Sequence, residues 1–397
     1  MSTTIREAKV PAITIMGIAL ASVLVPLNST MIAVALPDIA RSFDISKSHA
    51  SVLITLYLAA MMVGQPLAGR LGDLVGARRV AFVAVTGFGV CSLGAMFVGS
   101  FGALVALRAM QACFAAALSP SVQAMLRAVV PADQRGRAFG VQSSVIGVGA
   151  GLGPVIGGVA VAGFGWRAIF GVNLPIVLAV LYVLRRHTVA PEAAADHRKI
   201  VPTESGSSRM FNGSFTAAFS TQALSTFAQY ALLLSVPIVL DSRGWGAATI
   251  GLSLTALTLG MVVMGPLGGR TGDLRGRRWP VIIGLCVTLG AVAASAVMGD
   301  DVPSWMLVAT LLGFGLGLGF ATPSIMTAGI ESAPEGRIGA AAGVLSASRY
   351  VGSIAATLVL AGVVGDDGEG LSLMLIVCVA TLVPALLWTR KLPGQHG

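Results

Sequence analysis

Two arginines stand within long apolar stretches of the sequence, where charged side chains are rare. Arg108 lies in the stretch 102–126, and Gln111 follows three residues later on the same helical face. Arg349 lies near the middle of the stretch 338–363. An ionisable group at membrane depth is costly and usually serves a function. The alternative for Arg108 is that its guanidinium group extends to the membrane interface.

A stripe of uncharged polar residues marks the stretch 213–240. Gln222, Ser225, Thr226 and Gln229 recur there at helical spacing. Such a stripe either joins neighbouring helices by hydrogen bonds or lines a cavity, and the sequence leaves both possibilities open. We expect a substrate cavity whose candidate residues are Asn28, Met31, Arg108, Gln111, Gln222, Thr226, Gln229 and Arg349.

The sequence carries no residue set that is typical of an enzyme. It has no acid–His–nucleophile arrangement and no nucleotide-binding loop, and its four cysteines lack metal-ligand and redox spacing. The glycine-rich run 313–319 lies inside an apolar stretch, where glycines favour close helix packing over phosphate binding. We therefore expect no catalytic activity, no cofactor and no metal.

The composition predicts a membrane protein. The chain of 397 residues is 55% hydrophobic and 11% charged, whereas soluble domains carry about 25% charged residues. The apolar stretches are long enough to span a bilayer as helices and too long for barrel strands. We predict an all-α membrane protein with twelve transmembrane helices. Their ranges are 12–36, 49–69, 80–100, 102–126, 138–163, 168–185, 213–240, 248–268, 279–298, 304–328, 338–363 and 371–389.

The net charge of +9 is a topology signal rather than a nucleic-acid footprint. Of the 26 Lys and Arg, 20 fall on one side of the predicted bundle, four on the other and two within spans. The positive-inside rule then puts both termini in the cytoplasm of a protein of the inner or plasma membrane.

The two ends of the chain are related in sequence. Segments 61–79 and 261–279 are identical at 11 of 19 positions, and a second similarity at an offset of 203 relates 131–149 to 334–352. We predict two parallel six-helix halves, 1–185 and 213–397, joined by a cytoplasmic linker, 186–212. Such halves enclose a site that opens alternately to either side.

The repeated loop contains glycines for a tight turn and an aspartate that can accept backbone N–H bonds. It resembles the signature loop of the major facilitator superfamily, here present in each half. That resemblance implies a conformational latch formed by Gly69, Asp73, Arg78, Gly269, Asp273 and Arg278.

A second motif lies in the stretch 138–163, where small residues permit close helix contact and a proline bends the helix. It resembles the antiporter motif of drug:proton exporters of this superfamily, with Gly149, Gly153, Pro154, Gly157 and Gly158 at its positions. Segment 166–175 is similar to the WRxIFxxNxP segment of the fourteen-span drug exporters. The resemblance implies a twelve-span exporter that lacks their two central helices.

The first span resembles the exporters' motif LDxTxxNVALP, but Asn28 stands at the position of its aspartate. An amide cannot titrate, and no carboxylate or histidine falls in a predicted span interior. The resemblance still implies proton-linked export. Asp38 and Asp241, at the span ends, are the nearest candidates for coupling.

Arg108 and Arg349 without an acid should favour neutral or anionic amphiphiles over lipophilic cations. We therefore expect a monomeric exporter of drugs or small amphiphilic metabolites in the lipid bilayer, with H⁺ as the coupling ion. Two alternatives stay open at this point. One is an importer of a nutrient or organic anion, and the other is a membrane sensor that transports nothing.

Overall fold

The structure is a computed structural model that describes residues 12–186, 211–334, 336–363 and 370–394. All regular elements in these ranges are helical, and twelve helices are long and apolar enough to cross a membrane. The predicted fold class is confirmed. The proposed linker falls mainly on residues outside the described ranges, so the domain boundaries stay a prediction.

The first half begins with a broken helix that forms a single span, and five further spans follow. Its elements are α1 (Ala12–Leu20), η1 (Ala21–Val23), α2 (Leu24–Ser42), α3 (Lys47–Ala50), α4 (Val52–Val75), α5 (Ala77–Met96), α6 (Phe101–Val129), η2 (Ala132–Gln134), α7 (Arg135–Phe164), α8 (Ala168–Gly171) and α9 (Asn173–Arg186).

The second half has the same plan. Its elements are α11 (Gly213–Ser242), α12 (Ala247–Arg275), α13 (Arg278–Val297), η4 (Gly299–Asp301), α14 (Ser304–Glu331), α15 (Ile338–Val363), α16 (Leu371–Trp388) and η5 (Thr389–Lys391).

Several helices run past the ends that the sequence predicted, and two of them, α2 and α11, do so at equivalent places. Helices α2 and α11 continue through Pro37 and Pro237 to Ser42 and Ser242. A proline removes one helical hydrogen bond, but packed neighbours make such a loss tolerable within a membrane bundle. The repeat in sequence is therefore also a repeat in helix length.

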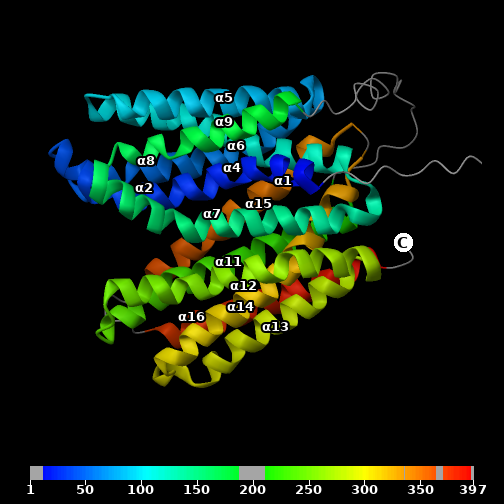
Figure 1. Cartoon of the computed structure of the whole chain (residues 1–397). Coiled ribbons are helices and arrows are strands. Elements are labelled where there is room, and N and C mark those ends of the chain that lie inside the picture. Colours follow the sequence, from blue (N-terminus) through cyan, green and yellow to red (C-terminus); the bar gives the residue numbers. More distant parts are fainter. Residues whose placement is uncertain (1–11, 187–210, 335, 364–369, 395–397) are drawn as a thin grey trace, which may run out of the picture.

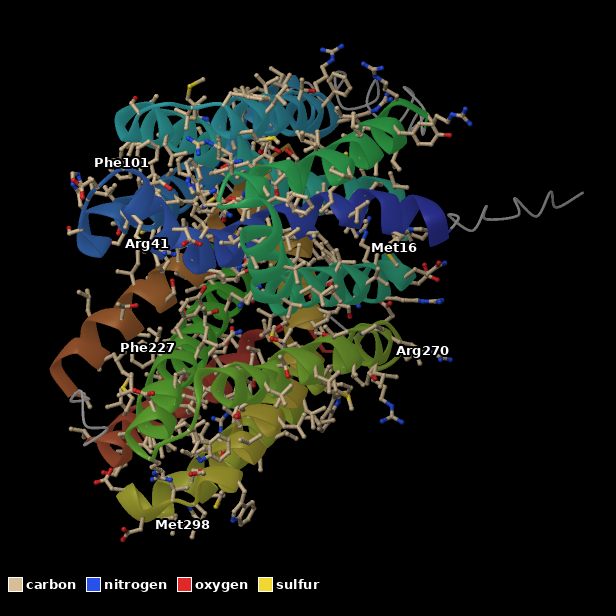
Figure 2. All side chains as sticks on the ribbon, turned by 60° about the vertical axis from the view of Figure 1, so that its left-hand side comes forward. Met16, Arg41, Phe101, Phe227, Arg270 and Met298 are labelled. Carbon is tan, nitrogen blue, oxygen red and sulfur yellow. The ribbon has the colours of Figure 1, made fainter. Side chains whose placement is uncertain are left out.

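The halves meet chiefly along two helix pairs, with further contacts of α6 on α15 and of α7 on α14. Helix α4 packs against α15, and α7 packs against α12. The ribbons of the halves lie close together on the right of Figure 1, where α4 and α12 end and α7 and α15 begin, and they diverge toward the left. We call the closed side the basic end, because arginines such as Arg270 lie there; Phe101 and Met298 mark the opposite end (Figure 2).

Helix α7 reaches both neighbours through small residues. On one face, Gly149, Gly153 and Gly157 lie against α2, and a Cβ atom added at Gly157 would be 3.1 Å from Met31 Cα. On another face, a Cβ atom at Gly140 would be 2.5 Å from the carbonyl oxygen of Gly265 on α12. The antiporter-like segment thus packs α7 tightly on its own half, while neighbouring glycines pack it on the other half.

We predict that Gly153→Ala destabilises the protein and that Gly158→Ala does not. A Cβ atom at Gly153 would overlap Thr30 and approach the carbonyl oxygen of Leu27 at 3.2 Å, whereas nothing lies within 4 Å of one at Gly158. Overpacking of this kind costs about 1–3 kcal/mol. Thermal unfolding of the purified variants in detergent measures the difference, and equal midpoints would contradict the packing described here.

Candidate functional site

Arg108 is buried at the centre of the first half. Its side chain is 1% exposed and donates from Nη1 to Asn28 Oδ1 on α2 and to Gln111 Oε1, the latter at 2.6 Å. The guanidinium carbon lies 4.1 Å from the centroid of the Tyr57 ring on α4. The guanidinium group therefore faces the interior of the bundle, not the membrane interface.

A buried polar network continues from this arginine. Gln111 Nε2 donates to Ser92 Oγ on α5 at 2.7 Å, and Asn173 Nδ2 on α9 donates to the same oxygen at 3.3 Å. Asn173 belongs to the segment that resembles the WRxIFxxNxP motif, and sequence reasoning had given it no role. Arg108 Nε and Nη2 have no hydrogen-bond partner among the described residues. The network therefore holds the cation but leaves two of its three guanidinium nitrogens without a hydrogen bond.

The other cavity candidates fall into two groups. Gln222 and Thr226 are buried and bonded to each other at 3.2 Å within α11, so this bond favours neither the helix-joining nor the cavity-lining interpretation of the stripe. Met31 is buried against α7. Gln229 is half-buried and lies 3.6 Å from Met261 Sδ, and Arg349 is half-buried on α15.

The two coupling candidates, Asp38 and Asp241, lie at the end of the bundle opposite the basic end. Asp38 is half-buried near the end of α2 and forms an ion pair with Arg41, which is labelled in Figure 2. Asp241 is exposed near the end of α11. Among the described residues, no ion pair involves Arg108 or Arg349. The role of Asp38 and Asp241 stays a prediction.

At the basic end, Asp73 of the first half caps a helix of the second half. Its Oδ1 accepts from Gly339 N at 2.6 Å and its Oδ2 from Ala340 N at 2.8 Å, at the start of α15. A Cβ atom at Gly69 would overlap the backbone of Gly339. The glycine is therefore needed for the close approach that lets the carboxylate reach these amides.

Asp273 makes the equivalent contact in the reverse direction. It accepts from Gly136 N at 2.7 Å and from Arg137 N at 2.8 Å, at the start of α7. Gly269 approaches Gly136 as closely as Gly69 approaches Gly339. Each half thus caps a helix of the other half, and we call these two contacts the latches.

Only the latch of Asp273 is reinforced by a charged cluster. Arg277 Nη1 lies 2.5 Å from Asp273 Oδ1, its Nη2 lies 3.1 Å from Glu331 Oε1, and Arg135 lies 3.8 Å from the same glutamate. Burial opposes the charge of Arg277, but its bonds to Glu331 and Asp273 outweigh burial and raise the pKa of the guanidinium above its ordinary value. This cation therefore stays charged.

The predicted latch arginines act elsewhere. Arg78 donates from Nε and Nη2 to the carbonyl oxygen of Leu184, at 3.1 and 2.5 Å, within its own half. Arg278 contacts Pro393 through its backbone N–H, also within its own half. Their side chains make no cross-half bond among the described residues, so their role in the latch stays a prediction. Sequence reasoning missed Arg277, although the repeat marks it by placing Ala77 at the matching position.

We predict that Asp73→Ala and Asp273→Ala open the basic end. The reporter is Ser346→Cys in a chain without the four native cysteines, because Ser346 is buried and contacts Ser119 and Gln123 across the halves. A hydrogen bond to a charged group contributes about 1.5–3 kcal/mol, so maleimide labelling should accelerate at least about tenfold.

The matched control for the latch variants is Asp133→Ala, since Asp133 is exposed at the same end. This variant should label at the rate of the parent chain. Labelling of both latch variants at that same slow rate would contradict the role assigned to the latches.

Comparison with known proteins identifies a family that has this architecture. The family model described as the Major Facilitator Superfamily matches residues 18–357 and also residues 218–396. The tetracenomycin C resistance and export protein of Streptomyces glaucescens is 27% identical over 87% of this chain and 74% of its own length. The multidrug resistance protein Stp of Mycobacterium tuberculosis is 27% identical over 88% of this chain and 75% of its own. The proton:xylose symporter XylE has a similar fold, with a TM-score of 0.78 at 15% identity over 96% of each chain.

Proposed function

Because the chain belongs to the Major Facilitator Superfamily, we propose that it is a secondary-active exporter of drugs or small amphiphilic metabolites. Membership makes it a multi-pass membrane transporter of small molecules rather than an enzyme. The observation that carries the proposal is the pair of reciprocal latches, which join the halves at the basic end while the ribbons diverge toward the other end (Figure 1). Parallel halves that rock about a central site provide alternating access.

The charge distribution supports one orientation in the membrane. The basic end gathers arginines from both halves: Arg79 near the start of α5, Arg185 near the end of α9, Arg275 at the end of α12 and Arg390 just after α16. The positive-inside rule assigns such an end to the cytoplasm. The conformation described here would then be closed to the cytoplasm, with both termini on that side of the inner or plasma membrane, and the working unit would be a monomer.

The direction of transport rests on likeness to exporters. Two relatives are named for resistance, one of them also for export, and both align over most of this chain. The glycines of the antiporter-like motif pack α7 on α2, so these residues serve helix packing in this protein. An importer would instead accumulate substrate in whole cells, and a sensor would transport nothing in liposomes.

We predict that cells producing the chain accumulate less drug than control cells, and that collapse of the proton gradient removes the difference. Asp38 is the better-placed proton acceptor, because it is half-buried on the helix that carries Asn28, whereas Asp241 is exposed. Asp38→Asn should lower gradient-driven export at least about threefold, and Asp241→Asn should leave it unchanged. Export that survives both a protonophore and Asp38→Asn would contradict proton coupling.

We also predict that Asn28→Asp shifts export toward cations. The new carboxylate would lie against Arg108 and neutralise it, because Asn28 Oδ1 already accepts a hydrogen bond from Arg108. The ratio of ethidium export to export of an anionic antibiotic should rise at least about tenfold, which corresponds to about 1.4 kcal/mol.

The matched control for this variant is Asn212→Asp. Asn212 caps α11 outside the spans by accepting from Phe215 N, and aspartate caps helices equally well. An unchanged export ratio in Asn28→Asp, with normal total transport, would contradict the view that uncompensated charge sets selectivity.

A further inference from the structure

Three of the four tyrosines in the chain gather where the two halves meet. Tyr57 lies on α4, Tyr230 on α11 and Tyr350 on α15. Tyr57 belongs to the buried core, Tyr230 and Tyr350 pack against that core, and α15 packs on both α4 and α11. The fourth, Tyr182, lies on α9 beside Arg186. Aromatic rings with hydroxyl groups thus come together from three helices that belong to both halves, and we take this arrangement as a candidate site.

Each side of this gathering carries an arginine. Arg108 lies over the ring of Tyr57, and Arg349 directly precedes Tyr350 on α15, the helix that packs against α11 and its Tyr230. We call these five residues the arginine–tyrosine cluster. No carboxylate pairs with either arginine in the part of the chain that the structure describes, so the cluster carries two positive charges without a fixed counter-charge.

The two arginines differ in what they can offer a ligand. Arg108 is 1% exposed and its Nη1 is already bonded to Asn28 and Gln111. Arg349 is half-buried, and it makes no hydrogen bond or ion pair with a described residue. Of the two guanidinium groups, that of Arg349 is therefore the one within reach of an entering molecule.

The position of Arg349 on its helix directs it inward. Ser346, three residues before Arg349, contacts Ser119 and Gln123 of the first half. A Cβ atom at Gly352, three residues after Arg349, would be 2.2 Å from the carbonyl oxygen of Ala223 on α11. Residues three apart share a helix face, so Arg349 lies on the face that looks toward α11 and the first half.

An anion is the ligand that this chemistry favours. A cation that is held away from water without a counter-charge has a desolvation cost, and an anion that binds beside it offsets that cost. A guanidinium group presents parallel N–H donors that match the two oxygens of a carboxylate. Tyrosine hydroxyls add further donors, and their rings offer faces on which an aromatic group packs.

We propose that Arg349, with Tyr230 and Tyr350, binds the carboxylate of an aromatic monoanionic substrate. Arg108, held by Asn28 and Gln111 over the ring of Tyr57, is a positioning residue that keeps this region positive. The assignment rests on the proposed export function and adds to it the class of substrate and the side chain that recognises it.

Binding of matched probes to the purified full chain in detergent tests the assignment. The probes are biphenyl-4-carboxylate and biphenyl-4-carboxamide, which share an apolar body and differ in charge, and two further aromatic acid–amide pairs. The wild type should bind the acids at least about tenfold more tightly than the amides. Arg349→Gln should lose that preference while it still binds the amides, which also shows that the variant is folded, and Arg349→Lys should keep part of it.

The matched control is Arg270→Gln, because Arg270 is exposed at the basic end (Figure 2) and should leave the acid-to-amide ratio unchanged. An unchanged ratio in Arg349→Gln, no preference in the wild type, or no binding of any acid would each overturn the assignment. Acid binding that depends on Arg349 without export of the acid from proteoliposomes would support the site and contradict the proposed function.

Discussion

The contact between an aspartate of one half and the first amides of a helix in the other half is the constraint on which this conformation depends. The first amides of a helix have no partner within that helix, and the helix dipole makes them favourable for an anion. Asp73 and Asp273 each supply one carboxylate that accepts two such N–H groups. The contacts form only when the halves approach each other at this end. Each latch therefore makes the hydrogen bonds of one carboxylate depend on the position of an entire half.

The two latches are equal in geometry and unequal in their surroundings. Asp273 is bonded to Arg277, which also binds Glu331, whereas the repeat places Ala77 and Ala128 at the matching positions of the first half. Both depend on close backbone approach at glycines, which explains why the loop motif and the small residues of α7 and α15 occur together. The small residues set how near the halves come, and the carboxylates hold them there.

Most of the fold followed from the sequence, because hydrophobic length and the internal repeat are properties of the chain itself. Asp73 and Asp273 were also found, although they lie in the last turns of α4 and α12 rather than in the predicted loops. Their partners were not found, since backbone amides have no signature in a sequence. The bond of Arg78 could not be predicted, because only the structure reveals that the carbonyl oxygen of Leu184 lies within its reach. The end of α2 beyond Pro37 was missed because proline ends helices more readily in water than in a packed membrane bundle, whereas the predicted span 213–240 already included Pro237.

The polar centre was predicted in part. Arg108 and Gln111 are neighbours on one helix, so their contact could be predicted from their spacing. The contact of Arg108 with Asn28, which lies on another helix, could not. The tyrosines that gather between the two arginines are separated by more than a hundred residues along the chain. Their association depends on the packing of both halves, which no local pattern encodes.

The central claim is that the two ends open in alternation. Spin labels at Leu74 and Leu387 report on the basic end, and labels at Phe97 and Val297 report on the opposite end; all four residues are exposed. Distances between the labels of each pair should form a short population at the basic end and a long one at the opposite end in the absence of substrate. During transport a second population should appear in which both distances are reversed. A basic-end distance that stays unchanged while substrate is transported would contradict the account.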